Sequence, residues 1–166
     1  MTGVILLPIL LPWAAALLLL RLTRLGEKAM HIFVALAVSL NFLALLWVVS
    51  TFPGIQLHLL TFNPLLDLYL RPDSLGILFA VLASLLWILT SFYAFVYMKH
   101  EARVRQFFAF FLVTLGVTIG IAFAGNLLTF YVFYEFLTLA TFPLVIHAGS
   151  EEALAGGKKY ILYSFS

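Results

Sequence analysis

The feature that most constrains this chain is a series of apolar runs, each about as long as a lipid bilayer is thick. A hydrocarbon core of about 30 Å requires about 20 apolar residues in a helix. Polar stretches separate five complete runs of this size, at about residues 3–20, 29–51, 74–98, 106–124 and 127–147. The sequence therefore predicts an all-α fold, a polytopic transmembrane helix bundle.

The composition excludes a soluble globular domain. Hydrophobic residues make up 64% of the chain and charged residues 10%, with a mean hydropathy of +1.14, which is more apolar surface than a soluble fold of this size can bury. The sequence has no cysteine, which excludes Fe–S clusters and thiolate metal sites. No phosphate loop, nucleophile triad or metal-ligand cluster is recognisable. We therefore expect no cofactor, metal, redox centre or nucleic-acid partner in this chain.

A sixth apolar run begins near Gly157 and continues to Ser166, the last residue of the sequence. Ten residues rise only about 15 Å in a helix, which is about half of the bilayer core. We expect residues 1–166 to form a single transmembrane domain with five complete helices and the start of a sixth. This domain would be the N-terminal part of a longer subunit.

The basic residues predict the orientation of the bundle. Eight of the nine fall on one side of the predicted topology: Arg21, Arg24, Lys28, Lys99, Arg103, Arg105, Lys158 and Lys159. Only Arg71 falls on the other side. Because basic loops are retained in the cytoplasm, the sequence predicts an integral protein of a prokaryotic cytoplasmic membrane, with its N-terminus outside.

The second connection, residues 52–73, has the pattern of a short external β-hairpin. Pro53–Gly54 and Asn63–Pro64 are turn signals. After them, Leu66, Leu68 and Leu70 alternate with Asp67, Tyr69 and Arg71. Strict alternation is typical of a strand with one apolar face.

One acidic residue lies inside an apolar run. Glu135 is near the middle of residues 127–146, whereas the other six acids lie between the runs: Glu27, Asp67, Asp73, Glu101, Glu151 and Glu152. A carboxylate at such a depth costs about 2.5–3.5 kcal/mol on insertion scales. This contrast makes Glu135 the principal functional candidate.

Polar groups accompany Glu135 along its helix. At 100° per residue, three side chains share its face: Tyr131, Thr138 and Phe142. Pro143 cannot donate to the carbonyl of Leu139, which predicts a kink and a freed acceptor. Such a row can hold water and pass protons. The alternative is that Glu135 is a neutral carboxyl that bonds a neighbouring helix, and that Pro143 only kinks its own.

Other candidates lie further from the carboxyl. Lys158 and Lys159 are possible partners for Glu135, although anchoring at the membrane interface agrees better with the positive-inside rule. His147 lies about 18 Å beyond Glu135 along a helix, as an interfacial residue or an entry to a proton path. The small residues Gly116, Gly120 and Ala124 predict close helix contact. We interpret the tryptophans as lipid-facing or core aromatics.

Residues 123–146, with Asn126, Glu135 and Pro143, followed by residues 153–160, with Lys158 and Lys159, resemble the antiporter-like membrane subunits of respiratory complex I. The same family includes the large subunits of multisubunit Na⁺/H⁺ antiporters and related subunits of membrane-bound hydrogenases. Residues 71–75 also resemble the acidic helix entry of that family. The resemblance covers most of residues 71–166.

This resemblance implies a role for Glu135. In that family the fifth helix carries a glutamate that is essential for ion translocation, and Glu135 matches it. The resemblance implies an H⁺- or Na⁺-translocating subunit of a redox-driven complex, with other membrane subunits and the lipid bilayer as partners. The alternative is a structural or assembly role without transport. An unrelated secondary transporter would predict internal repeats, and we find no duplication between the first and second three helices.

Overall fold

The structure is a computed structural model, and it describes residues 2–22, 24–63, 66–98 and 103–145. Its elements are η1 (Thr2–Leu6), α1 (Leu7–Arg21), α2 (Glu27–Thr51), β1 (Leu57–Asn63), β2 (Leu66–Leu70), α3 (Ser74–Tyr97), α4 (Val104–Ala122) and α5 (Leu127–Val145). The predicted sixth helix, His147, Lys158 and Lys159 lie outside the described residues.

Five spans of the described chain are long and apolar enough to cross a membrane. They confirm the predicted transmembrane bundle, and the chain is an integral membrane protein. The boundaries differ from the prediction by one or two residues in several places. The largest difference from the prediction is at the start of the chain, where a 3-10 helix, η1, precedes α1. Pro8 occupies the first turn of α1, where a backbone N–H group is not needed for the helix.

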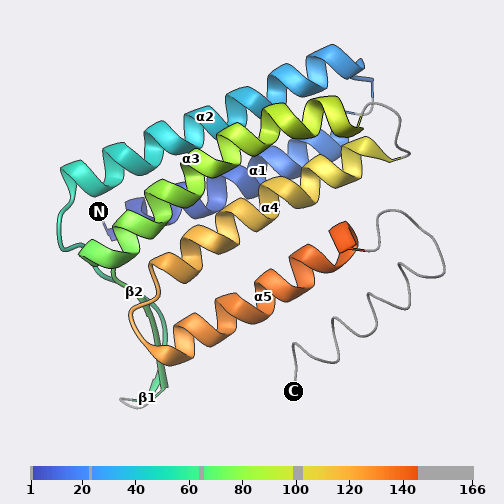
Figure 1. The fold of residues 1–166 in the computed structure, drawn as a ribbon. Coiled ribbons are helices and arrows are strands. Elements are labelled where there is room, and N and C mark those ends of the chain that lie inside the picture. The colour runs from blue at the N-terminus through green and yellow to red at the C-terminus, as the bar shows by residue number, and fades with distance from the viewer. Residues whose placement is uncertain (1, 23, 64–65, 99–102, 146–166) are drawn as a thin grey trace.

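Helices α1 to α4 form a four-helix bundle, and α5 lies outside it against α4 (Figure 1). In the bundle α1 packs on α2 and α4, and α3 packs on the same two helices. Of the five spans, α4 has the largest buried share and α5 the smallest. The helix that carries Glu135 is therefore the least enclosed by the described residues.

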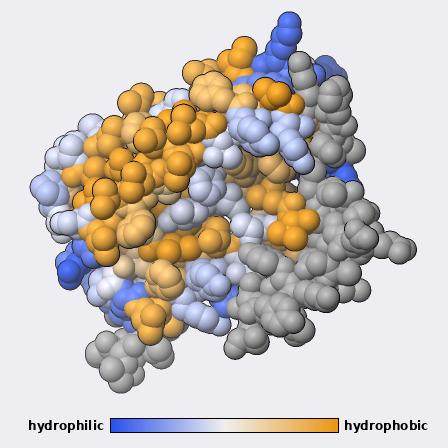
Figure 2. Space-filling view, in the orientation of Figure 1, coloured by the Kyte–Doolittle hydropathy of each residue, from blue (hydrophilic) through white to orange (hydrophobic). Residues whose placement is uncertain are grey.

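The helices alternate in direction, so their connections gather at two ends. The α1–α2 and α3–α4 connections lie at one end, here called the basic end, with Arg21, Arg24, Lys28, Arg103 and Arg105. The chain start, the hairpin and the α4–α5 turn lie at the other, the hairpin end (Figure 1). Between the ends, apolar side chains cover much of the face shown in Figure 2.

Small residues let α4 approach two neighbours closely, as the sequence predicts. A side chain at Gly116 would collide with the Ile9 carbonyl and the Trp13 indole, both of α1. A side chain at Gly120 would collide with the ring of Phe133 on α5. Helix α4 thus uses consecutive glycines of one stripe to contact α1 and α5, which places α5 in van der Waals contact with the bundle.

Two tryptophans join helices through hydrogen bonds. The Trp13 indole nitrogen donates to the Val113 carbonyl over 3.1 Å, and the Trp87 indole nitrogen donates to the Phe111 carbonyl over 3.0 Å. Both acceptors belong to α4, so α1 and α3 are each fixed in register against it.

The second connection forms the predicted antiparallel hairpin. Leu57 pairs with Leu70 and His58 with Tyr69, and register shifts interrupt the ladder further along. Gly54 has a φ of +74° in the turn before β1, as expected for a Pro-Gly turn. The hairpin also continues onto the α4–α5 turn through a bridge between Leu70 and Ala124.

Candidate functional site

Helix α5 begins at a cap that the sequence supplies. The Asn126 side-chain oxygen accepts a hydrogen bond from the Thr129 backbone N–H over 2.8 Å, and the Asn126 carbonyl accepts from the Phe130 N–H over 3.0 Å. Asparagine is among the best residues at this position because its side chain satisfies a backbone donor that lacks a helical partner.

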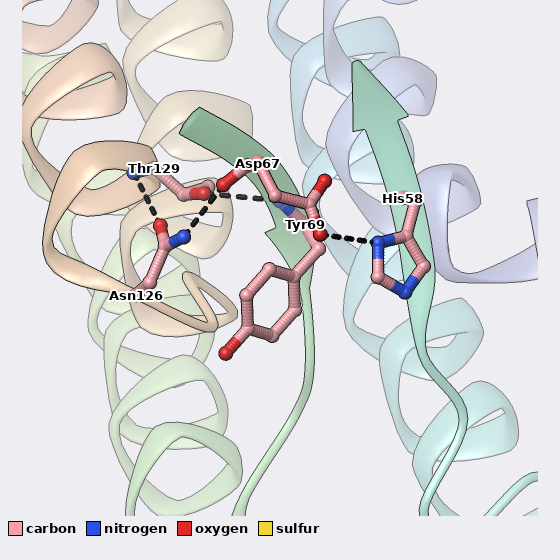
Figure 3. A network of polar contacts seen from close by, with 5 residues as sticks. All are labelled: His58, Asp67, Tyr69, Asn126 and Thr129. Atoms are coloured by element: carbon pink, nitrogen blue, oxygen red, sulfur yellow. Dashed lines mark hydrogen bonds and ion pairs between the residues drawn. The ribbon is translucent and has the colours of Figure 1, made fainter. Parts of the chain in front are cut away.

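The same asparagine ties α5 to the hairpin (Figure 3). Its amide nitrogen donates to the Asp67 carbonyl over 2.6 Å, and the Tyr69 N–H donates to the Thr129 hydroxyl over 3.0 Å. The Gly125 N–H donates to the Tyr69 carbonyl over 3.0 Å. A side chain at Gly125 would collide with the Tyr69 ring. Strand β2 therefore fixes where α5 starts.

A histidine–aspartate pair closes the outer side of this network. His58 Nδ1 lies 2.6 Å from Asp67 Oδ2, and the His58 ring stacks on Tyr69 with centroids 5.5 Å apart. The His58 side chain is about half exposed, so water and salt weaken the pair. Its contribution to stability is about 0–1 kcal/mol, and the backbone hydrogen bonds remain the main tie between β2 and α5.

Glu135 lies at the middle of α5, about 12 Å from the helix start at 1.5 Å per residue. Both of its carboxyl oxygens are shielded from solvent, and neither has a hydrogen-bond partner among the described residues. The Tyr131 phenol, one turn away, interacts with this carboxyl without reaching hydrogen-bond geometry. Buried polar atoms are paired in most structures, so an exception requires an explanation.

The row along the Glu135 face changes from exposed to buried. Tyr131 is exposed, Glu135 and Phe142 are half-buried, and Thr138 is fully buried. The Thr138 hydroxyl donates to the Tyr134 carbonyl of its own helix over 3.3 Å. That hydroxyl is therefore engaged locally rather than directed to the carboxyl.

A hollow of about 750 Å³ opens beside the first two turns of α5. Its lining residues are Asn126, Leu127, Leu128, Phe130, Tyr131 and Tyr134. Of these, Tyr131 lies one helical turn before Glu135, and Tyr134 directly precedes it. The hollow thus approaches the carboxyl from the hairpin end of the bundle.

The predicted site is placed only in part. Tyr131, Glu135 and Thr138 follow each other along α5, and Pro143 lies inside its last turn. Lys158, Lys159 and His147 are outside the described residues, so their predicted roles stay predictions. Across the described ranges, no group of three His, Asp or Glu side chains is placed to hold a metal ion.

Two further polar features of the structure were not predicted from the sequence. Asn126 has the signature of a helix cap, a short polar residue directly before an apolar run. Asn41 of α2 and Ser84 of α3 are fully buried, and their side-chain polar atoms have no hydrogen-bond partner among the described residues. Only helix register brings such residues inside, and a single sequence does not reveal it.

Part of this chain is similar in sequence to known proteins. No family model matches. A probable K⁺/H⁺ antiporter subunit of Rhizobium meliloti (strain 1021) is 36% identical over 80 residues, which are 48% of this chain and 8% of that protein. A Na⁺/H⁺ antiporter subunit of Staphylococcus aureus (strain JH9) is 30% identical over 79 residues, again 48% of this chain and 10% of that protein.

One solved structure shares the fold across nearly the whole chain. It is the structure of the membrane-bound sulfane sulfur reductase, described as an archaeal respiratory membrane complex. The TM-score is 0.81 with 22% identity, over 96% of this chain and 34% of that chain. The chain therefore spans about a third of that neighbour and a tenth or less of the antiporter proteins. Together these matches confirm the resemblance of this chain to the antiporter-like membrane subunit family.

Proposed function

We propose that this chain is part of an H⁺- or Na⁺-translocating membrane subunit in a multisubunit complex, with Glu135 as the proton carrier within the membrane. The sequence relatives are named as subunits of cation/proton antiporters, and the structural neighbour is a respiratory membrane complex. Both support a chain that works beside other membrane subunits. In the proposed orientation the N-terminus and the hairpin lie outside a prokaryotic cytoplasmic membrane.

The observation that carries the proposal is the shielded carboxyl of Glu135, which has no hydrogen-bond partner among the described residues. In general, an apolar environment favours the protonated form of a carboxyl. An approaching cation favours the ionised form. A carboxyl without a fixed local hydrogen bond can respond to both influences, whereas a carboxyl bonded firmly to a neighbouring helix would be held in one state.

The side chains on the Glu135 face of α5 support proton transfer between the carboxyl and the hairpin end. Tyr131 lies at the wall of the open hollow and interacts with Glu135. Water in that hollow would reach the phenol and hence the carboxyl. Pro143, with its missing N–H, is the proposed helix kink beyond the carboxyl. His147, Lys158 and Lys159 remain proposed members of the pathway.

Replacing Glu135 by glutamine tests the proposal. The amide keeps the size and hydrogen-bonding capacity of the side chain but cannot release a proton, so Glu135→Gln should abolish or strongly reduce ion movement while the complex still assembles. Glu135→Asp should do less harm, and Glu135→Ala should impair both transport and packing. Proton uptake into vesicles that hold the intact complex is measured together with its energy-supplying reaction.

Glu27→Gln is the matched control, because Glu27 is an exposed acid in the first turn of α2 and loses the same charge away from α5. We expect it to leave transport unchanged. A structural role for Glu135 predicts instead that glutamine works nearly as well as glutamate. If the Glu135→Gln complex moves ions at the parental rate and ratio, Glu135 is not the proton carrier.

A further inference from the structure

An apolar groove of about 400 Å³ runs between α1, α4 and α5. Its walls include Trp13, Leu17 and Leu20 of α1, Val113 of α4, and Phe136 and Leu139 of α5. Among these six side chains the Trp13 indole has the one hydrogen-bonding group, and it already donates to the Val113 carbonyl. The groove therefore offers an occupant apolar contact and no polar recognition.

The groove is open along its rim. The Leu17 side chain is 65% exposed and the Leu139 side chain 53% exposed. Within the described part of the chain this rim is open, so a lipid chain has access to the groove wherever the rim faces hydrocarbon.

A basic hollow lies at one end of this groove. Arg21 follows Leu17 by one helical turn on the same face of α1. Together with Leu22, Arg24 and Leu25 it lines a hollow of about 290 Å³. Arg21 and Arg24 are both exposed, and the hollow belongs to the basic end of the bundle. The apolar groove at Leu17 is thus followed, one helical turn along α1, by the positive charge of Arg21.

The register of α1 against α4 brings a third arginine to the same level. Trp13 bonds Val113, and the two helices run in opposite directions. Eight residues further along α1 is Arg21, and eight residues back along α4 is Arg105. The Arg105 Nη2 donates to the Leu25 carbonyl over 3.1 Å, and its Nε is shielded without a partner among the described residues. Arg105 therefore holds the loop that forms the hollow and adds positive charge beside it.

We propose that the apolar groove and the basic hollow form one binding site for an anionic phospholipid, with an acyl chain in the groove and the phosphate at Arg21 and Arg24. Guanidinium groups match phosphate oxygens in geometry and charge, and basic pockets at the ends of transmembrane helices recognise anionic headgroups. A protein helix in the groove would not require cations at its end. The site is independent of the role proposed for Glu135.

Photoactivatable lipids test this site in the complete protein within its assembled complex. Vesicles contain a trace of phosphatidylglycerol or phosphatidylcholine with the same diazirine-bearing acyl chain, and mass spectrometry maps the labelled peptides. We expect phosphatidylglycerol to label the peptides of Leu17 and Leu139 well above phosphatidylcholine. A basic residue near an anionic headgroup contributes about 1 kcal/mol, roughly fivefold in affinity. Arg21→Gln with Arg24→Gln should therefore lower the phosphatidylglycerol labelling roughly 25-fold.

Arg71→Gln is the matched control, since it removes one exposed arginine at the hairpin end and should leave the labelling unchanged. If the double variant does not assemble, a salt series on the parental complex replaces it. The preference for phosphatidylglycerol should fall between 0.1 M and 1 M salt, as the Debye length falls from about 10 Å to 3 Å. Equal labelling by both lipids, no labelling because a protein segment fills the groove, or a preference that persists in 1 M salt would each overturn the proposal.

Discussion

The contact between Gly120 and Phe133 determines how closely α5 approaches α4, and a double-mutant cycle measures it. In Gly120→Ala the new methyl group would overlap three carbons of the Phe133 ring. The ring is only 8% exposed, so it has little space in which to turn. Overpacking of this kind costs about 1–3 kcal/mol. The better helix propensity of alanine offsets at most about 1 kcal/mol of this cost.

Phe133→Leu removes the atoms that the methyl group meets. Alone it costs about 1 kcal/mol, the typical effect of a substitution. Combined with Gly120→Ala it should restore part of the lost packing, so the double variant should be about 1–2 kcal/mol more stable than the sum of the single changes. The free energy of unfolding is measured by titration of the purified protein with sodium dodecyl sulfate in mixed micelles, followed by circular dichroism.

Gly116→Ala provides the control for this cycle. Its methyl group would meet the Ile9 carbonyl and the Trp13 indole, neither of which Phe133→Leu relieves. The effects of Gly116→Ala and Phe133→Leu on the free energy of unfolding should therefore be additive within about 0.5 kcal/mol. Additivity in the Gly120 cycle as well would show that Gly120 does not set the α4–α5 distance, and the reasoning from close contact would fail.

Three further outcomes are expected. Asn126→Ala should cost about 1–2 kcal/mol in the same unfolding titration, because it removes both the cap of α5 and the hydrogen bond to the Asp67 carbonyl; a change below about 0.3 kcal/mol would contradict this role. Gly54→Ala should cost about 1–2 kcal/mol through its positive φ alone, since open space surrounds the position; equal stability of the two proteins would mean that the turn relaxes. Reporter fusions in intact cells should place Glu27 in the cytoplasm and Leu60 outside, and the reverse result would overturn the proposed orientation.

The transmembrane elements were predictable because the bilayer imposes a length and a composition on every span. The five apolar runs and the alternation around Leu68 led directly to the helices and the hairpin. The boundaries were less exact where tertiary contacts determine them. Helix α4 ends at Ala122 rather than near Ala124, because the next residues bind the end of the hairpin. The N–H of Arg71, the residue after β2, donates to the Phe123 carbonyl over 2.7 Å.

The contacts between helices were not predictable, because they depend on register. The sequence predicts that Trp13 and Trp87 are lipid-facing or core aromatics, and both pack against the core. The sequence does not predict that each also donates a hydrogen bond to a carbonyl of α4. The small-residue stripe predicted close approach, but only the structure shows that Gly116 serves α1 and Gly120 serves α5. A periodic pattern reports which residues share a face, and it does not report which neighbour that face meets.

The attachment of α5 limits how a change at Glu135 can act on the rest of the chain. The start of the helix is held by hydrogen bonds of the Gly125 and Tyr69 backbones, which do not depend on the charge of a side chain. Gly120 then fixes the distance of α5 to α4 within the first two turns. If Glu135 gains or loses a proton, as we propose, this end of α5 has little freedom to follow. The response must arise in the groups that cover the carboxyl and in the helix after it, where Pro143 interrupts the hydrogen-bond ladder. With its first half anchored and its second half interrupted, α5 would direct a conformational effect of the proposed proton transfer away from the hairpin end, although the proton itself would move toward that end.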